Sequence, residues 1–229
     1  MPDIPAGRAT ALAGVLLAGG RSRRMGGGDK CLRPLAGRPM LAHIIARARP
    51  QVGPLVLNVN GDSARFADFG IPVAGDVVAG FAGPLAGILT GLEWAAQHAP
   101  QCTHVASFAC DAPFFPEDLV ARLAAAMAEA DAELACAASA GRAHPVFALW
   151  PVALRASLRQ ALVGEGLRKI DAWTARYRLV TVDFPAIATV AGPLDPFFNV
   201  NTPADLAAAE DFAAALAVQG AAQGAAMPS

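Results

Sequence analysis

The chain has 229 residues, 55% of them hydrophobic, and a formal net charge of −1, which suits one sizeable α/β domain and argues against non-specific binding of nucleic acid. Its mean hydropathy of +0.40 is inflated by alanine, and no uninterrupted apolar stretch approaches the ~20 residues needed to cross a bilayer. We therefore predict a protein with neither a nucleic acid nor a membrane as its partner.

The first element is a short buried strand, predicted over residues 14–18, and a glycine-rich basic segment follows it directly. Residues 17–30 read LAGGRSRRMGGGDK, and the first forty residues carry seven basic and only two acidic side chains. Glycines let backbone N–H groups turn toward a ligand, and Arg21, Arg23, Arg24 and Lys30 add the positive charge. Together they favour a polyphosphate-binding loop over an ordinary solvated loop.

Two familiar phosphate loops do not fit these residues. A Walker A loop needs Ser or Thr after its lysine, and here Cys31 follows Lys30. A dinucleotide fingerprint needs GxGxxG opening directly into a helix, and the spacing here is wrong. Neither ATP hydrolysis nor hydride transfer is therefore the leading hypothesis.

Beyond the loop, predicted strands and helices alternate. Helices are expected over residues 39–48, 63–69, 84–96, from 116, 152–162, 167–177 and 203–217, and further strands over 55–59, 71–74, 103–108, 133–138, 146–149 and 179–184. This order predicts a single α/β domain over residues 14–217, a mostly parallel central sheet flanked by helices. Residues 1–13 are expected to be a flexible extension, and residues 218–229 a disordered tail.

Polar residues stand where the predicted strands end. Gly19 follows the first strand, Asn58 ends the second, Asp76 follows the third and Asp111 follows the fourth. In open α/β sheets ligands bind at the carboxyl ends of the strands. Asp111 could hold a hard cation there or cap the helix near Pro116, and Asp76 and Asn58 could equally serve turn and strand-end hydrogen bonds.

The segment 17–30 resembles the signature of the molybdenum cofactor guanylyltransferases, within the wider Rossmann-like nucleotidyltransferase family. GPLAG at residues 83–87, CDAP at 110–113, HP at 144–145 and NVNTP at 199–203 follow in that family's order, so the resemblance covers roughly residues 14–212. One departure is Cys31, where a small residue such as glycine is usual.

The resemblance implies a set of site residues. Lys30, Asp111 and Arg24 would be catalytic, and Asp111 would bind Mg²⁺, the expected cofactor. Nucleotide contacts would come from Leu17, Ala18, Gly19, Lys30, Asn58, Asp76 and Asp111. Of these, Asp76 and Asn58 are the candidates for reading the guanine base.

The second substrate would be a pterin phosphate bound opposite the nucleotide. A phosphate-bearing ligand needs hydrogen-bond donors, which later segments supply in Arg142, His144, Asn199 and Asn201. Arg168 and Lys169 could contribute or could form a solvated helix face, and His144 could instead be a structural turn residue.

The resemblance thus implies transfer of GMP from GTP to the terminal phosphate of molybdopterin, preferably carrying molybdenum, with release of pyrophosphate and formation of the molybdenum guanine dinucleotide cofactor. A cytidylyltransferase for the same pterin, a sugar-phosphate nucleotidyltransferase and a non-catalytic cofactor carrier are the alternatives. Transient contacts with other cofactor-biosynthesis proteins and molybdoenzyme chaperones are expected. Four cysteines without CxxC or other metal-ligand spacing indicate a reduced, cytoplasmic protein.

Overall fold

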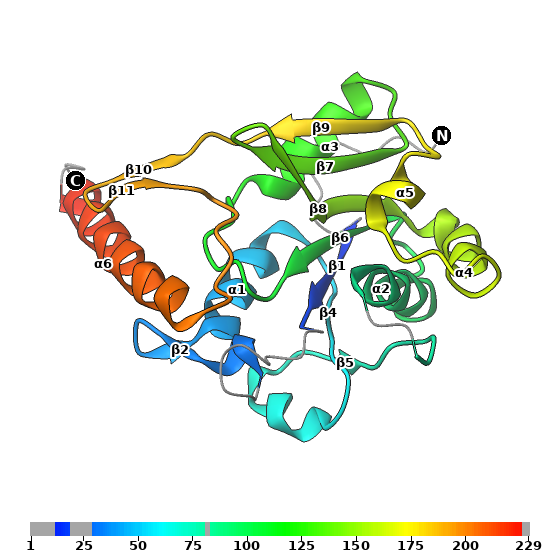
Figure 1. The fold of residues 1–229 in the computed structure, drawn as a ribbon, viewed down its shortest axis with the longest axis horizontal. Coiled ribbons are helices and arrows are strands. Elements are labelled where there is room, and N and C mark those ends of the chain that lie inside the picture. Colours follow the sequence, from blue (N-terminus) through cyan, green and yellow to red (C-terminus); the bar gives the residue numbers. More distant parts are fainter. Residues whose placement is uncertain (1–11, 19–28, 81–82, 226–229) are drawn as a thin grey trace.

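The computed structural model describes residues 12–18, 29–80 and 83–225, and within them seven strands form one twisted central sheet (Figure 1). Its strands are β1 (Leu12–Leu17), β4 (Leu55–Asn58), β5 (Val73–Ala74), β6 (His104–Ala109), β7 (Leu134–Ser139), β8 (Arg142–Pro151) and β9 (Leu179–Asp183). They lie in the order β5-β4-β1-β6-β8-β7-β9. The predicted mostly parallel α/β sheet is confirmed.

Only β8 runs against its neighbours within this sheet, because it pairs antiparallel with both β6 and β7. The other described pairs, β1 with β4, β1 with β6, β4 with β5 and β7 with β9, are parallel. The carboxyl ends of β1, β4, β5, β6 and β7 therefore meet at one edge of the sheet, together with the beginning of β8. That edge is where the predicted site residues should gather.

Helices cover both faces of the sheet. They are α1 (Met40–Ala48), α2 (Pro84–His98), α3 (Leu119–Glu129), α4 (Arg155–Val163), α5 (Ile170–Thr174) and α6 (Pro203–Ala225). One buried cluster joins the sheet to α1, α3 and α6, and a second joins it to α2, α4 and α5. In β1, Leu12 and Leu16 belong to the first cluster and Ala13 and Val15 to the second, as the alternation of a strand buried on both sides requires.

Two small hairpins lie outside the main sheet and were not predicted. They are β2 (Pro34–Leu35) with β3 (Arg38–Pro39), and β10 (Ile187–Thr189) with β11 (Gly192–Leu194). The strands of these hairpins are only two or three residues long, which is too short for an alternating hydrophobic pattern to be recognised in the sequence. Figure 1 shows the second hairpin extending toward α6, the helix at the left of the view.

The predicted ends of the chain differ from the structure in two places. The strand expected from residue 14 begins at Leu12, and the helix expected to end near residue 217 continues to Ala225. The sequence from residue 218 to 225 was predicted to be disordered because of its low complexity, yet alanine is the strongest helix former and here it extends the helix. The domain limits themselves stay a prediction, and residues 1–11 and 226–229 lie outside the described part.

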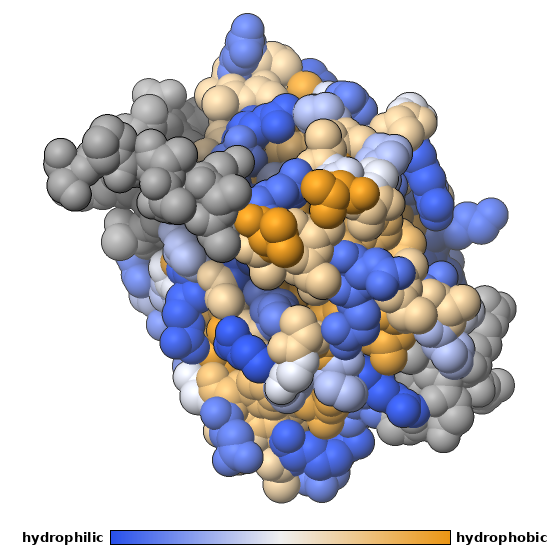
Figure 2. Space-filling view, turned by 90° about the vertical axis from the view of Figure 1, so that its left-hand side faces the viewer, coloured by the Kyte–Doolittle hydropathy of each residue, from blue (hydrophilic) through white to orange (hydrophobic). Residues whose placement is uncertain are grey.

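Figure 2 turns the face with α6 and the β10–β11 hairpin toward the viewer, where hydrophobic and hydrophilic residues are interspersed. Val190, beyond the end of β10, and Val218, in α6, are the large hydrophobic side chains of these elements that are most exposed. None of the helices in the described ranges combines the length and the apolar character that a membrane span requires.

Candidate active site

Three predicted site residues from distant parts of the chain meet at the carboxyl edge of the sheet. Lys30 begins the 3₁₀ turn η3 (Lys30–Leu32), Asp111 follows β6, and Asn201 precedes α6. The Lys30 ammonium donates a hydrogen bond to Asn201 Oδ1 at 2.5 Å, and its Nζ lies 3.8 Å from Asp111 Oδ2. The structure therefore brings together the end of the glycine-rich loop, the predicted metal ligand and the NVNTP segment.

Backbone hydrogen bonds at the strand ends fix this arrangement. The N–H of Ala18 donates to the Asn58 carbonyl at 3.0 Å, and the N–H of Cys110 donates to the Leu17 carbonyl at 3.1 Å. On the far side, the N–H of Val200 donates to the Asp111 carbonyl at 2.7 Å. The main chain around Asp111 is thus held from both sides.

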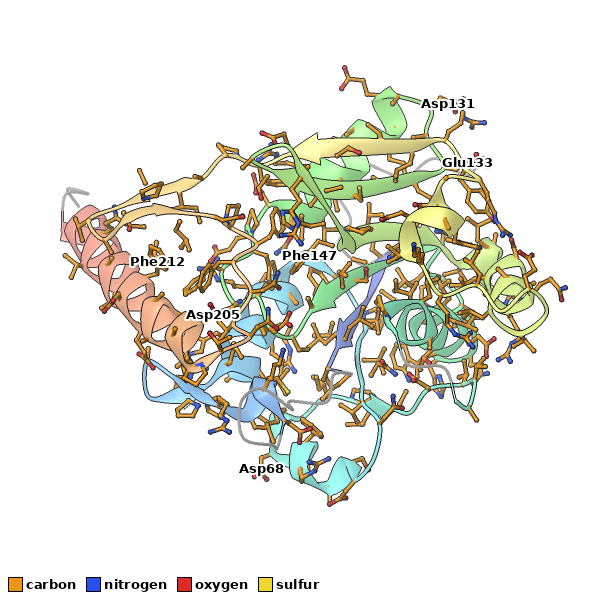
Figure 3. All side chains as sticks on the ribbon, viewed as in Figure 1. Asp68, Asp131, Glu133, Phe147, Asp205 and Phe212 are labelled. Atoms are coloured by element: carbon orange, nitrogen blue, oxygen red, sulfur yellow. The ribbon has the colours of Figure 1, made fainter. Side chains whose placement is uncertain are left out.

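The first turn of α6 sets the position of Asn201. Thr202 Oγ1 accepts a hydrogen bond from the Asp205 N–H at 3.1 Å, and Asp205 Oδ2 accepts from the N–H groups of Thr202 and Asn201 at 2.8 and 2.9 Å. This is a reciprocal capping arrangement, and Figure 3 shows Asp205 at this end of the helix. The T-x-x-D spacing was readable in the sequence but was not used in the prediction.

We expect Asp205→Ala to destabilise the fold by about 1 kcal/mol, because two backbone donors lose their acceptor. The pKa of Asp205 lies below its ordinary value, and the hydrogen bond from the Asn201 N–H is the largest cause. A carboxyl with a lowered pKa stabilises the fold at pH values above its ordinary pKa, and this contribution is lost as the pH falls through the lowered value. Urea unfolding at neutral pH should show the loss, which should shrink in acid.

The control for this change is Asp211→Ala, at an exposed position farther along the same helix. It removes a carboxylate without removing a cap. Equal unfolding midpoints for Asp205→Ala and Asp211→Ala would contradict a capping role for Asp205.

Asp111 lies half-buried beside Lys30, and its environment disfavours a lone charge. Burial raises the pKa of Asp111 above its ordinary value, while Lys30 acts in the opposite direction. The capping alternative for Asp111 does not hold, because α3 begins eight residues later at Leu119 with Asp118 as its N-cap residue. Asp111 is therefore a partly desolvated carboxylate at the carboxyl edge of the sheet.

The residues flanking Lys30 hold the exit of the glycine-rich loop. Asp29 forms an ion pair and a hydrogen bond with Arg65 from the 3₁₀ helix η5 (Ser63–Phe69). Cys31 is buried, and burial, with Asp29 adding to it, raises the pKa of its thiol to about 12. Cys31 therefore remains a neutral thiol that packs in the core, so its departure from the family pattern adds no nucleophile.

Asn58 and Asp76, the two candidates for reading the base, are hydrogen-bonded to each other. Asn58 Nδ2 donates to Asp76 Oδ1 at 3.0 Å, and Asn60, which the sequence reasoning missed, donates from Nδ2 to Asp76 Oδ2 at 2.7 Å. A Cβ on Gly87 would lie 2.4 Å from Asn58 Oδ1, so the GPLAG segment needs glycine there. Asp76 is thus oriented by two amides at the predicted edge.

Several predicted residues cannot be placed. Gly19 and the loop arginines Arg21, Arg23 and Arg24 lie outside the described residues. Leu17 and Ala18, at the end of β1, are described and stand at the entrance to that segment.

The residues predicted for the second substrate fall into two groups. Arg142 is exposed and His144 is half-buried, both at the beginning of β8. Asn199 is half-buried and is separated from Asn201 in the sequence by the buried Val200. These residues lie on segments at the carboxyl edge.

Arg168 and Lys169 precede α5 instead. Trp173 of α5 packs against Trp150, near the opposite end of β8, with ring centroids 5.9 Å apart. The structure therefore does not bring these two cations to the site. They are exposed, as the alternative of a solvated helix face required, but they lie in the segment before α5 and not on a helix.

A metal ion at this site would depend on few protein ligands. Across the described residues, no group of three or more His, Cys, Asp or Glu side chains is arranged to hold a metal. Asp111 is the acidic side chain closest to Lys30, and Mg²⁺ characteristically takes one or two carboxylates and completes its shell with water and substrate phosphates. The donor set around Asp111 fits an ion of that kind.

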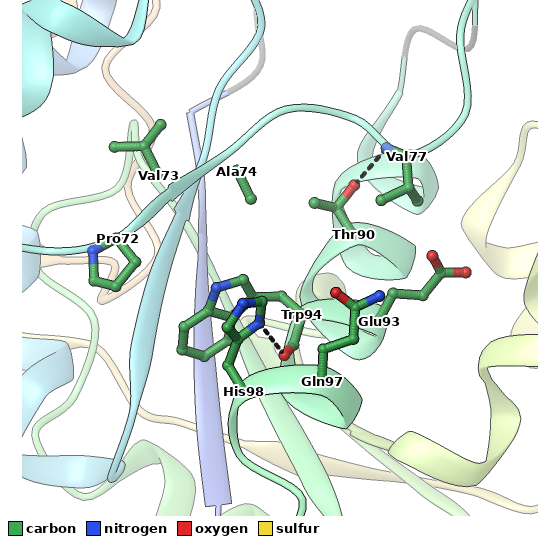
Figure 4. A pocket seen from close by; sticks show the side chains of 9 residues that line it. All are labelled: Pro72, Val73, Ala74, Val77, Thr90, Glu93, Trp94, Gln97 and His98. Atoms are coloured by element: carbon green, nitrogen blue, oxygen red, sulfur yellow. Dashed lines mark hydrogen bonds between the residues drawn. The ribbon is translucent and has the colours of Figure 1, made fainter.

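A surface cavity of about 550 Å³ lies beside β5 and α2 (Figure 4). Its lining includes the stacked rings of Trp94 and His98, and the Thr90 hydroxyl, which accepts a hydrogen bond from the Val77 N–H at 3.1 Å. Lys30, Asp111 and Asn201 are not among the residues that line it. The cavity is therefore separate from the convergence of charged residues.

Comparison with known proteins agrees with this geometry. A molybdenum cofactor guanylyltransferase of Bradyrhizobium sp. (strain ORS 278) is 58% identical over 90% of this chain and 94% of its own length. The enzyme of the same name from Rhodopseudomonas palustris (strain BisB5) is 53% identical over 93% and 97%.

A solved structure, molybdopterin-guanine dinucleotide biosynthesis protein A from Archaeoglobus fulgidus, superposes with a TM-score of 0.66 at 22% identity over 88% of this chain and 98% of that one. This likeness concerns the fold. The family model described as MobA-like NTP transferase domain matches residues 14–180, so the chain belongs to that family.

Proposed function

We propose that this protein transfers GMP from GTP to the terminal phosphate of molybdenum-molybdopterin, releasing pyrophosphate and forming the molybdenum guanine dinucleotide cofactor. The meeting of Lys30, Asp111 and Asn201 beside the glycine-rich loop carries the proposal, because it joins a cation, a metal-binding carboxylate and a neutral hydrogen-bonding group at one edge. The names of relatives that share more than half of the sequence supply the substrates.

The proposed reaction needs no covalent enzyme intermediate. The phosphate of molybdopterin is already an anionic nucleophile, so one of its oxygens attacks the α-phosphorus of GTP as the bond to pyrophosphate breaks. The protein must align the two phosphates and offset the negative charge that develops on the leaving group. Both tasks fall to groups at the carboxyl edge of the sheet.

Lys30 is suited to the second task. An ammonium has three N–H donors, and the contacts with Asn201 and Asp111 leave at least one for a phosphate oxygen. Asn201 holds the ammonium through a hydrogen bond, so the charge is fixed in place before the nucleotide arrives. A preorganised charge loses little energy to rearrangement during the reaction.

Asp111 would hold Mg²⁺ in this proposal. When bound, the ion would neutralise phosphate oxygens and help align the triphosphate. Burial that raises the pKa of Asp111 also makes the carboxylate gain more from a cationic partner than an exposed one would. Contacts with other cofactor-biosynthesis proteins and chaperones, and a cytoplasmic location, stay predictions.

The deciding experiment is turnover of GTP and molybdopterin with pyrophosphate detection, run beside CTP and with Mg²⁺ titrated. We expect pyrophosphate release that requires GTP, molybdopterin and Mg²⁺ together. Exclusive use of CTP would favour the cytidylyltransferase alternative. Tight binding of the finished cofactor without turnover would favour a carrier.

Asp76 is the residue on which we test base selection. If its carboxylate accepts from the N1–H and amino groups of guanine, Asp76→Ala should weaken GTP more than inosine triphosphate, which lacks the amino group. A lost acceptor costs about 1 to 3 kcal/mol where a bond existed, which corresponds to a loss of roughly fivefold to 150-fold in kcat/KM.

Asn60→Ala is the matched control, because it removes a partner of Asp76 and keeps the carboxylate. Equal losses for both nucleotides in Asp76→Ala would assign Asp76 the structural role of holding Asn58.

A further inference from the structure

A chain of hydrogen bonds links His144, Ser139 and Asp195 near the proposed second-substrate side. His144 Nε2 lies 2.7 Å from Ser139 Oγ, and Ser139 Oγ donates to Asp195 Oδ1 at 2.8 Å. Ser139 ends β7 and is 3% exposed, His144 stands near the start of β8, and Asp195 follows β11. The sequence reasoning missed Ser139 and Asp195, since no spacing rule connects them.

Donor and acceptor chemistry determines which nitrogen of His144 carries the proton. A carboxylate only accepts hydrogen bonds, so the single proton of the Ser139 hydroxyl points to Asp195. Toward His144 the hydroxyl oxygen can then only accept. His144 Nε2 must therefore carry a hydrogen, and in a neutral ring Nδ1 is left as an acceptor.

The surroundings keep the ring neutral and fixed. Burial lowers the pKa of His144 below its ordinary value; Asp195 opposes this effect and Arg142 adds to it. The ring packs against Phe197, with centroids 4.6 Å apart. Among the described residues the ring makes its one hydrogen bond with Ser139, so Nδ1 keeps its capacity to accept.

Asp195 also ties this ring to the active site. Its Oδ1 accepts a second bond, from the Phe197 N–H at 2.9 Å, at the beginning of the segment that leads to Asn201. Within that segment the Val200 N–H bonds to the Asp111 carbonyl. The orientation of His144 and the placement of the Lys30 partner thus depend on one short stretch of chain.

We propose that Asp195 and Ser139 hold His144 so that its Nδ1 accepts a hydrogen bond from a ring N–H group of the second substrate. An ionised phosphate offers no donor to such an atom, whereas the edge of a pterin carries N–H groups. His144 would therefore recognise the ring rather than the phosphate, contrary to its expected role as a phosphate donor. The inference rests on the proposed function, because the pterin is that reaction's acceptor.

The first test is independent of turnover. Nitrogen NMR of the imidazole rings at neutral pH distinguishes the two tautomers, and the signals of His144 are assigned from their loss in His144→Gln, since the chain has only four histidines. We expect a neutral His144 with hydrogen on Nε2. A ring with hydrogen on Nδ1, or on both nitrogens, would overturn the proposal.

The second test separates the two nitrogens by kinetics. The amide of His144→Gln reaches toward Ser139 as Nε2 does, so the fold is kept while the Nδ1 acceptor is lost. We expect the KM for molybdopterin to rise about tenfold, the equivalent of one hydrogen bond, with the KM for GTP unchanged. An unchanged KM for molybdopterin in a folded His144→Gln protein would overturn the proposal.

Asp195→Ala, which removes the acceptor of the Ser139 proton, and Ser139→Ala test the positioning residues. Both should raise the KM for molybdopterin and leave the KM for GTP unchanged. Ser157→Ala should change neither KM, because the Ser157 hydroxyl lies on α4 and is hydrogen-bonded to Tyr177 instead. A fall in kcat with both KM values unchanged would contradict the positioning role. If wild-type protein showed no guanylyl transfer, the proposed function would fail while the NMR result still decided the tautomer.

Discussion

Asp111→Asn is expected to lower guanylyl transfer by about 10³-fold, which corresponds to about 4 kcal/mol of transition-state stabilisation. Asparagine keeps the size of the side chain and can still accept a hydrogen bond, but it lacks the charge that binds a hard cation. Turnover should be measured across a magnesium titration, where high Mg²⁺ should restore part of the rate. Unchanged turnover at every concentration would rule out Asp111 as the metal ligand.

The same substitution should not destabilise the metal-free protein. The pKa of Asp111 is raised in the fold, so the ionised carboxylate is less favourable there than in the unfolded chain. Its destabilising effect is present at pH values above the raised pKa and disappears as the pH falls below the ordinary value.

Thermal unfolding should therefore give Asp111→Asn a Tm at least equal to that of the wild type at pH 8, with the difference shrinking in acid. Asp118→Asn, at the exposed N-cap position of α3, is the matched control for both activity and stability. A large loss of Tm in Asp111→Asn alone would point to a structural role for Asp111.

Lys30→Ala is expected to lower turnover by about 10²-fold or more, because it removes the fixed ammonium that offsets charge on the departing pyrophosphate. The chain has only two lysines, so Lys169→Ala, on the surface beside α5, is a matched control that should retain full activity. Steady-state turnover with pyrophosphate detection checks both variants, and circular dichroism checks the fold. Near-normal turnover in a folded Lys30→Ala protein would contradict the proposed role.

The pH dependence of activity below neutral pH provides a second test of Lys30→Ala. Lys30 favours the ionised form of Asp111, so its removal should raise the pKa of Asp111 further. Residual activity that depends on ionised Asp111 should then fall away at a higher pH than in the wild type. Coincident acid limbs in the two proteins would show that Lys30 and Asp111 are not coupled during the reaction.

The sheet and its helices could be predicted largely because periodicity and strand-end residues are local properties. The start of β8 could not, because Pro145 lacks an N–H group and argues against a strand. The structure accommodates this proline where the register between β7 and β8 shifts. Cys136 pairs with Ala148, but the next residue of β7, Ala137, pairs with His144, so Pro145 lies in the irregular part of β8. An irregularity of this kind depends on the neighbouring strand, and sequence alone does not reveal it.

The candidate site shows the same division. Parallel topology was enough to predict that Asp111 and Asn58 lie at one edge. The glycine-rich basic segment indicated Lys30, and the match to the NVNTP motif supported Asn201. The individual bonds could not be foreseen, because the direct contact between Lys30 and Asn201 spans 171 positions of the chain. Asp195 and Ser139 carried no signal at all, since a carboxylate and a hydroxyl become partners only through the packing of β7 against the last loop.

The hairpin of β2 and β3 is bonded to α6, a much later part of the chain, and this affects the order in which contacts can form during synthesis. Ala36 and Gly37 turn the hairpin at φ values of 48° and 75°, and both Glu210 carboxylate oxygens accept a bond from the Ala36 N–H, at 3.0 and 2.9 Å. A ribosome releases the hairpin and Lys30 long before Asn201, which holds Lys30, and Glu210 of α6, which holds the hairpin. A nascent chain therefore carries Lys30 and the hairpin before the residues that hold them exist, and these contacts can form only after Asn201 and Glu210 have left the ribosome.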